Sequence, residues 1–119
     1  MKHNYKKLKI WIDSFELCLL IYKVTAQFPK NEMYGLVSQI NRSSISIPSN
    51  IAEGSSRSSE RDFSRFLEIA LGSLFELNTQ INIAYNLKFI EEKQYLKIDI
   101  KMEEIKKMII VFKNSLKND

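Results

Sequence analysis

Few residues in this sequence have the chemistry for acid–base, nucleophilic or metal-assisted catalysis. The chain holds one histidine, His3, at a terminus that we expect to be frayed, and one cysteine, Cys18, within an apolar run. A Cys–His or Ser–His–acid arrangement would need an ordered, buried histidine. Cys18 is therefore interpreted as a small buried hydrophobic residue, and the sequence offers no catalytic set.

Cofactor and metal sites are not expected either. The three glycines, at positions 35, 54 and 72, are too dispersed to form a phosphate-binding loop. Glu53, Glu68 and Glu76 could face the interior of a helical bundle, but di-metal sites in bundles use Glu-x-x-His pairs, for which the chain has no histidine. We therefore expect a protein that has no cofactor and is not an enzyme.

Basic residues form the clearest candidate binding surface. Three arginines recur at every fourth position: Arg57, Arg61 and Arg65. They would share one helix face, and the guanidinium fork suits phosphate recognition. Interleaved acids offer surface ion pairs as the alternative: Glu60, Asp62 and Glu68. Three lysines near the N-terminus form either a nucleic-acid-binding arm or a solubilising tail: Lys6, Lys7 and Lys9.

A second polar group falls on a segment that otherwise has the pattern of a packing helix: Gln39, Arg42, Asn50 and Glu53. Polar groups need hydrogen-bond partners where they are buried. Two interpretations stay open, a polar network that fixes helix register at an interface and a ligand-binding patch. We expect Asn50 and Glu53 in or beside a helix–helix or subunit interface.

Positioning these residues requires four helices, at about residues 9–28, 32–53, 59–87 and 91–116. Apolar residues recur in each at three- and four-residue steps, which is the helical period. The third helix carries a continuous seam: Phe63, Leu67, Ala70, Leu74, Leu77, Ile81 and Ala84. Long helices joined by short connections predict an all-α fold, an antiparallel up-down-up-down four-helix bundle.

Local signals set the expected ends of these helices. Pro29 ends the first helix, and Asn31 is the expected N-cap of the second. Pro48 falls inside the second helix and predicts a kink there. Ser59, followed three residues later by Asp62, predicts the start of the third.

Length and charge limit the remaining possibilities. The chain of 119 residues is expected to form a single domain over 1–119, with a net charge of +4 that is compatible with a polyanionic partner. One cysteine allows no internal disulfide. No segment is long and apolar enough to span a membrane, so we expect a cytoplasmic protein without a membrane partner.

The first predicted helix indicates self-association. Its expected core stripe is spaced at three and four residues: Leu8, Trp11, Phe15, Cys18 and Tyr22. The segment 17–22 is apolar on every side, and a helix without a polar face is buried on more than one side. In a chain this small the second side predicts a partner subunit, and hence a homo-oligomer.

Several motifs together resemble a known family. They are Phe28-Pro29, Glu32-x-Tyr34-Gly35-Leu36, Gln39-Ile40-x-Arg42, the segment Ser46-Ile47-Pro48-Ser49-Asn50-Ile51-Ala52-Glu53-Gly54, and Phe66-Leu67-Glu68-Ile69-Ala70-x-Gly72-Ser73-Leu74-x-Glu76-Leu77. This pattern is similar to the four-helix-bundle proteins also called the rRNA intervening-sequence protein family. The resemblance runs from about Trp11 to Phe112.

The resemblance implies a small four-helix bundle that assembles into a pentamer. Some family members are encoded within inserts of bacterial large-subunit rRNA genes. The family is also similar to the accessory variability protein of diversity-generating retroelements, a basic pentamer that binds nucleic acid and a reverse transcriptase. Lys88 stands where members usually have glycine, and because lysine is unfavourable in a left-handed helix cap, we expect a different turn here.

Two functions are consistent with these features. The first is a non-catalytic oligomer that binds RNA or DNA, or serves as an accessory subunit of a nucleic-acid enzyme. The second is a protein-interaction scaffold with no nucleic-acid role. A continuous basic surface favours the first, whereas cations neutralised by neighbouring acids favour the second.

Overall fold

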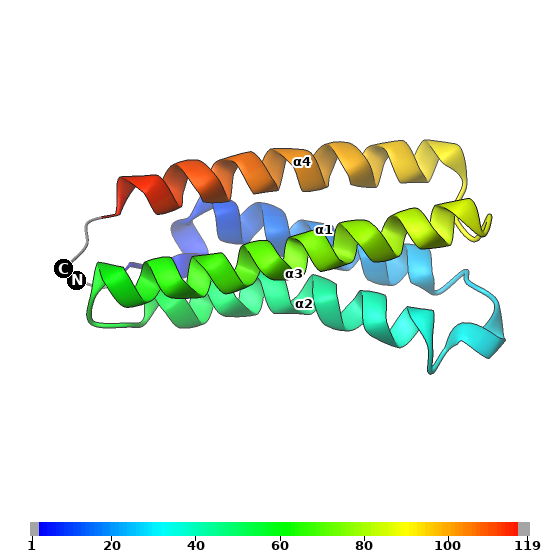
Figure 1. Cartoon of the computed structure of the whole chain (residues 1–119), viewed down its shortest axis with the longest axis horizontal. Coiled ribbons are helices and arrows are strands. Elements are labelled where there is room, and N and C mark those ends of the chain that lie inside the picture. The colour runs from blue at the N-terminus through cyan, green and yellow to red at the C-terminus, as the bar shows by residue number, and fades with distance from the viewer. Residues whose placement is uncertain (1–2, 117–119) are drawn as a thin grey trace.

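The apolar stripes form four α-helices in the computed structural model, which describes residues 3–116 (Figure 1). The helices are α1 (Lys9–Thr25), α2 (Leu36–Ser55), α3 (Glu60–Asn86) and α4 (Glu92–Ser115), with short 3-10 helices η1 (Tyr5–Lys7) and η2 (Lys30–Glu32). The described residues contain no strand. The predicted all-α class is confirmed; residues 1, 2 and 117–119 of the predicted domain lie outside the described part.

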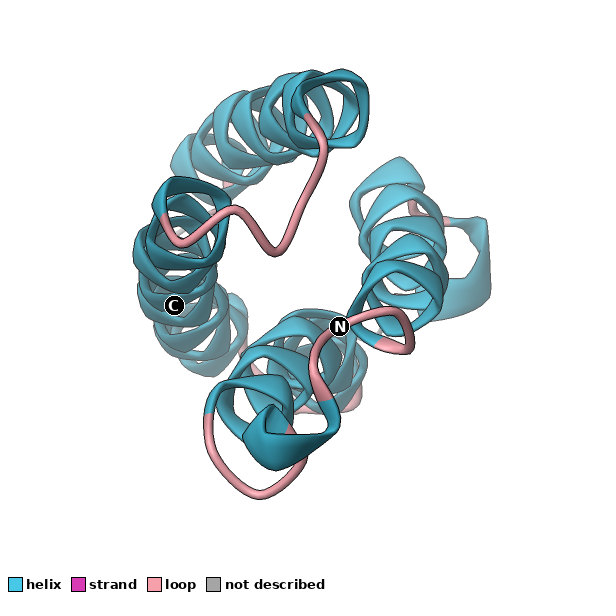
Figure 2. Ribbon diagram, turned by 90° about the vertical axis from the view of Figure 1, so that its right-hand side faces the viewer, coloured by secondary structure: helices cyan, strands magenta, loops and turns pink. Residues whose placement is uncertain are grey.

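The four helices surround a common centre, as the end-on view shows (Figure 2). Each packs against two neighbours, in the order α1, α2, α3, α4 around the bundle, and the contact between α2 and α3 is the most extensive. The links between consecutive helices lie at alternating ends (Figure 1). The result is a four-helix bundle of 46 × 24 × 20 Å, in which residues 5–8 and 55–60 meet at one end.

The core follows the predicted stripes on three helices. All seven seam residues of α3 are buried, and so are Ile40, Ile47 and Ile51 of α2 and Ile98, Ile105 and Ile109 of α4. Helix α1 differs, because its core side chains are Ile10, Leu17, Ile21 and Val24 together with Cys18.

The expected core stripe of α1 was therefore largely wrong. Phe15 and Tyr22 are exposed at 43% and 44%, and Trp11 is only half-buried. Because this helix is apolar all round, its periodicity fits two different stripes equally well. Packing against α2 and α4 selects the stripe that contains Leu17 and Ile21.

Two helix ends near the first link also differ from the prediction. Helix α1 ends at Thr25, three residues before Phe28, and the chain continues in a turn that leads to Pro29. Helix α2 begins at Leu36, not near Glu32, because Gly35 has non-helical backbone angles (φ −107°, ψ −106°). The Glu32 side chain accepts the Leu36 N–H (3.3 Å), so Asn31 is not the N-cap.

Three further residues shape the ends and contacts of α2 and α3, namely Ser59, Pro48 and Gly54. Ser59 caps α3 as predicted, its hydroxyl oxygen accepting the Asp62 N–H at 3.1 Å. Pro48 is buried within α2; the kink at this position stays a prediction. Gly54, near the end of α2, lies against α3: a Cβ there would sit 2.7 Å from Cβ of Phe66 and 2.8 Å from Cδ1 of Phe63.

The N-terminal residues pack against the bundle. The His3 N–H donates to the Ser55 carbonyl (3.2 Å), and the His3 ring centroid lies 5.1 Å from that of Phe63 and 5.8 Å from that of Phe112. The expectation of a frayed terminus at His3 was wrong, because aromatic contacts at this end of the bundle fix the segment. Tyr5 then packs edge-on against Trp11.

The turn after α3 keeps the left-handed cap despite its lysine. Lys88 has φ 66°, its N–H donates to the Tyr85 carbonyl, and the Phe89 N–H donates to the Ala84 carbonyl, both at 2.9 Å. This is the paired hydrogen-bond pattern of a Schellman cap. The expectation of a different turn was therefore wrong, since the two hydrogen bonds and the burial of Ile90 hold a conformation that lysine disfavours.

We predict that Lys88→Gly stabilises the protein by about 1 kcal/mol, because glycine adopts φ 66° without a steric penalty. Urea denaturation measures the change. Lys97→Gly is the matched control, because Lys97 is an exposed residue inside α4. Glycine there should instead lower the stability by about 1 kcal/mol. Loss of stability in Lys88→Gly would contradict the prediction.

Two glycine-to-alanine changes should act in opposite directions. Gly54→Ala forces a Cβ into Phe63 and Phe66 and should destabilise the fold by about 1–3 kcal/mol. Gly72→Ala should stabilise the fold by about 0.5–1 kcal/mol, because Gly72 is an exposed position of α3 and no atom lies within 4 Å of the added Cβ. Thermal unfolding of both variants checks the pair, and equal shifts would argue against the close approach of α2 and α3.

Candidate functional site

The six predicted nucleic-acid-binding residues gather at one end of the bundle. Lys6 and Lys7 belong to η1, Lys9 begins α1, and the three arginines follow the end of α2. Helix η1 contacts both α1 and α2, and His3 just before it reaches Ser55 at the end of α2 and Glu60 at the start of α3. In Figure 1 this is the end that carries the N-terminus and the α2–α3 link. We call Lys6, Lys7, Lys9, Arg57, Arg61 and Arg65 the basic end.

Acidic residues already pair with half of the basic end. Arg57 Nη2 lies 2.7 Å from Glu53 Oε2, and Arg65 Nε lies 3.9 Å from Asp62 Oδ1. Lys9 donates to Asp13 Oδ2 at 2.8 Å, and this hydrogen bond raises the pKa of Lys9, so the lysine stays charged. These are exposed pairs, which contribute little to stability and can exchange partners.

Phe66 orients two of the arginines. The guanidinium of Arg57 lies 4.7 Å from the centre of the Phe66 ring and that of Arg65 lies 5.0 Å from it, within cation–π range. The Phe66 side chain is buried, and its Cβ lies against Gly54. One aromatic side chain therefore contacts both Arg57 in the α2–α3 link and Arg65 on α3.

The other three cations of the basic end are exposed. Lys6, Lys7 and Arg61 take part in no ion pair among the described residues. Lys6 and Lys7 lie on an ordered turn that Asn4 caps through the Lys6 N–H (3.2 Å). Lys6 and Lys7 therefore lie on a short helix that contacts α1 and α2, and whether they bind nucleic acid or only add surface charge stays a prediction.

The predicted polar set divides into three places. Asn50 donates to the Ser46 carbonyl (2.8 Å) and hydroxyl (2.9 Å), and the Ser46 hydroxyl meets that of Ser73 at 2.8 Å across the α2–α3 contact. Glu53 pairs with Arg57 at the basic end. Gln39 and Arg42 lie in neither of these two places, because they precede Asn50 and Glu53 on α2 by about two to four turns.

Gln39 and Arg42 line a polar cleft of about 330 Å³ between α2 and α3. We define this α2–α3 cleft by its lining: Tyr34, Ser38, Gln39, Arg42, Ser43, Glu76 and Gln80. Ser43 donates to Glu76 Oε1 at 3.2 Å. Sequence reasoning missed Tyr34 and Gln80 and considered Glu76 only for metal binding; the spacing of Glu76 and Gln80, one turn apart beside the α3 seam, was the available signal.

An apolar groove of about 540 Å³ runs between α1 and α2. Its lining includes the α1 side chains that the core leaves out, among them Trp11, Phe15, Leu19 and Tyr22, and Ile45 of α2. Leu19 is exposed at 58%. We call this surface the α1–α2 groove.

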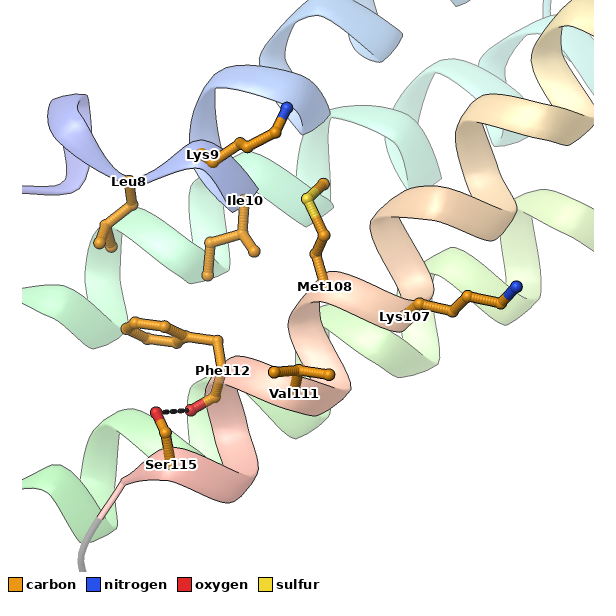
Figure 3. A pocket seen from close by; sticks show the side chains of 8 residues that line it. All are labelled: Leu8, Lys9, Ile10, Lys107, Met108, Val111, Phe112 and Ser115. Atoms are coloured by element: carbon orange, nitrogen blue, oxygen red, sulfur yellow. Dashed lines mark hydrogen bonds between the residues drawn. The ribbon is translucent and has the colours of Figure 1, made fainter.

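A second apolar pocket, of about 440 Å³, separates the start of α1 from the end of α4 (Figure 3). Ile10, Met108, Val111 and Phe112 form its walls, and the ammonium groups of its two lysines point away from them. The Ser115 hydroxyl donates to the Phe112 carbonyl at 2.6 Å within α4. The hydroxyl group that lines the pocket therefore already donates a hydrogen bond within α4, and the pocket has no polar pattern that suggests a ligand.

The residues with catalytic chemistry lie apart. Cys18 is buried, with Sγ 3.5 Å from the Ser44 hydroxyl oxygen, whereas His3 packs on Phe63 and Phe112 with Nε2 3.5 Å from Glu60 Oε2. Within residues 3–116, no three histidine, cysteine or acidic side chains gather in a way that could hold a metal ion. No helix in this part of the chain is long and apolar enough to cross a membrane.

The family of the chain follows from its sequence match. The model of the 23S rRNA-intervening sequence protein family matches residues 6–111. The chain belongs to this family. The match covers the basic end, the α1–α2 groove and the α2–α3 cleft, and it confirms the resemblance that the sequence motifs indicated.

A solved structure agrees with this assignment. It is a Bacteroides thetaiotaomicron protein of unknown function from the S23 ribosomal protein family, 26% identical, with a TM-score of 0.82 over 89% of this chain and 96% of that chain. No curated protein sequence matches the chain. The comparisons therefore give a family and a fold, and the function must be inferred from the surface.

Proposed function

We propose that this protein is a non-catalytic oligomer that binds RNA through the basic end. The observation that carries the proposal is that Lys6 and Lys7 on η1 and Arg61 on α3 are exposed toward the same end of the bundle and form no ion pair among the described residues. Exposed cations at one place favour phosphate binding. Arg57 and Arg65 add donors that exchange from their surface carboxylates to phosphate.

The mode of binding is mainly electrostatic. Lysine and arginine contacts to phosphate position a nucleic acid without reading its sequence. Glu53, Asp62 and Asp13 oppose binding at the basic end, since each neutralises one of its cations. A single subunit should therefore bind weakly, and repetition of the basic end in an oligomer provides the affinity.

Oligomerisation is proposed through the α1–α2 groove. Phe15, Leu19 and Tyr22 lie together on α1, and an exposed apolar surface of this kind marks an interaction site. A different set on α3 is also exposed, namely Ile69, Ile83 and Leu87. Two unlike apolar faces on one subunit suit a head-to-tail contact, which closes into a ring; the family resemblance sets the expected number at five.

The second candidate function is a protein-interaction scaffold with no nucleic-acid role. The ion pairs of Arg57, Arg65 and Lys9 favour it, because they neutralise half of the basic end. Both candidates require the oligomer. They differ in whether the basic end binds RNA in the absence of another protein.

We predict that Leu19→Glu disrupts the oligomer and leaves the subunit folded, because it places a charge in the α1–α2 groove. Light scattering should give about five times the 14.0 kDa of one chain for the unaltered protein and a smaller mass for the variant. Leu96→Glu, on α4 with 51% exposure, is the matched control and should leave the mass unchanged. A mass of one chain at all concentrations of the unaltered protein would contradict the proposal.

We predict that the protein binds unstructured RNA and that Lys6/Lys7/Arg61→Ala weakens this binding and its salt dependence. Losing three phosphate contacts should reduce the slope of log affinity against log salt by about 2. Fluorescence anisotropy at several salt concentrations measures the slope. Lys93/Lys97/Lys101→Ala removes the same charge from α4 and should leave most of the slope in place.

Two outcomes separate the candidate functions. No RNA binding at micromolar protein and low salt would favour the scaffold. Equal losses in the two triple variants would mean that net charge, not the basic end, determines binding.

A further inference from the structure

We propose that the α2–α3 cleft binds a guanine base, either in a free nucleotide or as an unpaired guanine of RNA. In the second case the inference rests on the proposed RNA binding and extends it from phosphate contact to base recognition. Apart from Tyr34, the residues that line the cleft come from the first turns of α2 and the second half of α3, and the start of α2 lies at the opposite end of the bundle from the α2–α3 link (Figure 1). The cleft is therefore a separate site on the same subunit.

The cleft carries one cation and one anion that do not neutralise each other. Arg42 on α2 and Glu76 on α3 both line it, yet no ion pair joins them, and Arg42 takes part in none among the described residues. The carboxylate of Glu76 accepts a hydrogen bond from Ser43 and keeps further acceptor capacity. A cation and an anion that do not pair with each other suit a ligand that has an acceptor edge for the cation and a donor edge for the anion.

A buried amide also faces this cleft without a partner. Gln80 is 9% exposed, and its Oε1 has no hydrogen-bond partner among the described residues. A buried polar atom left unpaired costs about 1–3 kcal/mol, so such groups usually have a partner. Gln80 lines the same cleft as Arg42 and Glu76, and a bound ligand with donors and acceptors gives this amide a partner.

The charges select the class of ligand. A ligand that is only a phosphate or a carboxylate would be repelled by the negative charge of Glu76. A simple amine would be repelled by the positive charge of Arg42. A neutral ligand with an acceptor edge and a donor edge satisfies both. Guanine has this pattern, since O6 and N7 accept from an arginine fork and the adjacent N1–H and N2–H₂ groups donate to a carboxylate.

An aromatic side chain at the cleft supports a planar ligand. Tyr34 is 92% exposed, although it lines the cleft, and it lies two residues after the end of η2. Exposed aromatic rings stack on unpaired bases in RNA-binding proteins. Arg42 and Glu76 thus read the edges of the base, while the Tyr34 ring covers its face.

The first experiment uses the whole chain and four nucleoside monophosphates. Isothermal titration should show that GMP binds about tenfold or more tightly than AMP, CMP or UMP, because only guanine matches both edges. Equal affinity for the four nucleotides, or binding of none, would overturn the site.

Variants assign the edges. Arg42→Lys keeps the charge but loses the fork, and Glu76→Gln keeps the shape and can still accept from Ser43 while losing the charge. Each should weaken GMP binding by about tenfold or more. Tyr34→Ala should weaken GMP binding, whereas Tyr34→Phe keeps the aromatic ring and should bind GMP like the unaltered chain. Glu68→Gln, exposed on α3 outside the cleft, is the control and should bind like the unaltered chain; circular dichroism checks that each variant is folded.

The source of the base is determined with RNA. Tighter binding of a guanine-containing single strand than of a guanine-free strand, lost in Glu76→Gln, would assign RNA as the source. GMP binding without any guanine preference in RNA would assign the free nucleotide. RNA binding that depends on salt but not on guanine, with no binding of GMP, would overturn the cleft and leave the basic end standing. Binding of GMP without binding of RNA would support the cleft and overturn the proposed RNA binding at the basic end.

Discussion

The close approach of α2 and α3 at Gly54 is the constraint on which the rest of the surface depends. Because residue 54 has no side chain, Phe63 and Phe66 pack directly against the backbone of α2. Phe66 then holds Arg57 and Arg65 near its ring. Farther along the same pair of helices, Ser46 meets Ser73 and Ser43 meets Glu76. One helix contact therefore sets both the arginines of the basic end and the register of the cleft.

The bundle separates its two polar surfaces. The basic end combines η1 and the start of α1 with the α2–α3 link and the start of α3, whereas the cleft lies between the start of α2 and the second half of α3. The basic end is rich in cations with mobile surface partners, which suits contact with many phosphates. The cleft has a fixed balance of charge and a buried amide, which suits one small group. An RNA strand that reached both would be held by phosphates at one and by a base at the other.

The apolar side chains outside the core lie elsewhere. The α1–α2 groove and the cleft share no lining residue. Association through the groove would leave Arg42 and Glu76 free to bind a ligand. Repetition around a ring would then present several basic ends and several clefts together, which strengthens weak contacts through multivalency.

The sequence alone determined the helices, most of the core and the cap of α3, because apolar spacing, Ser59 and the scarcity of glycine and proline act locally. It could not determine which stripe of α1 faces inward, since both sides are apolar and only packing distinguishes Leu17 from Phe15. Nor could it show that Lys88 keeps the left-handed turn, or that Tyr34, Arg42, Glu76 and Gln80 share one cleft. The cleft joins residues far apart in the chain, and only the tertiary contact of α2 with α3 brings them together.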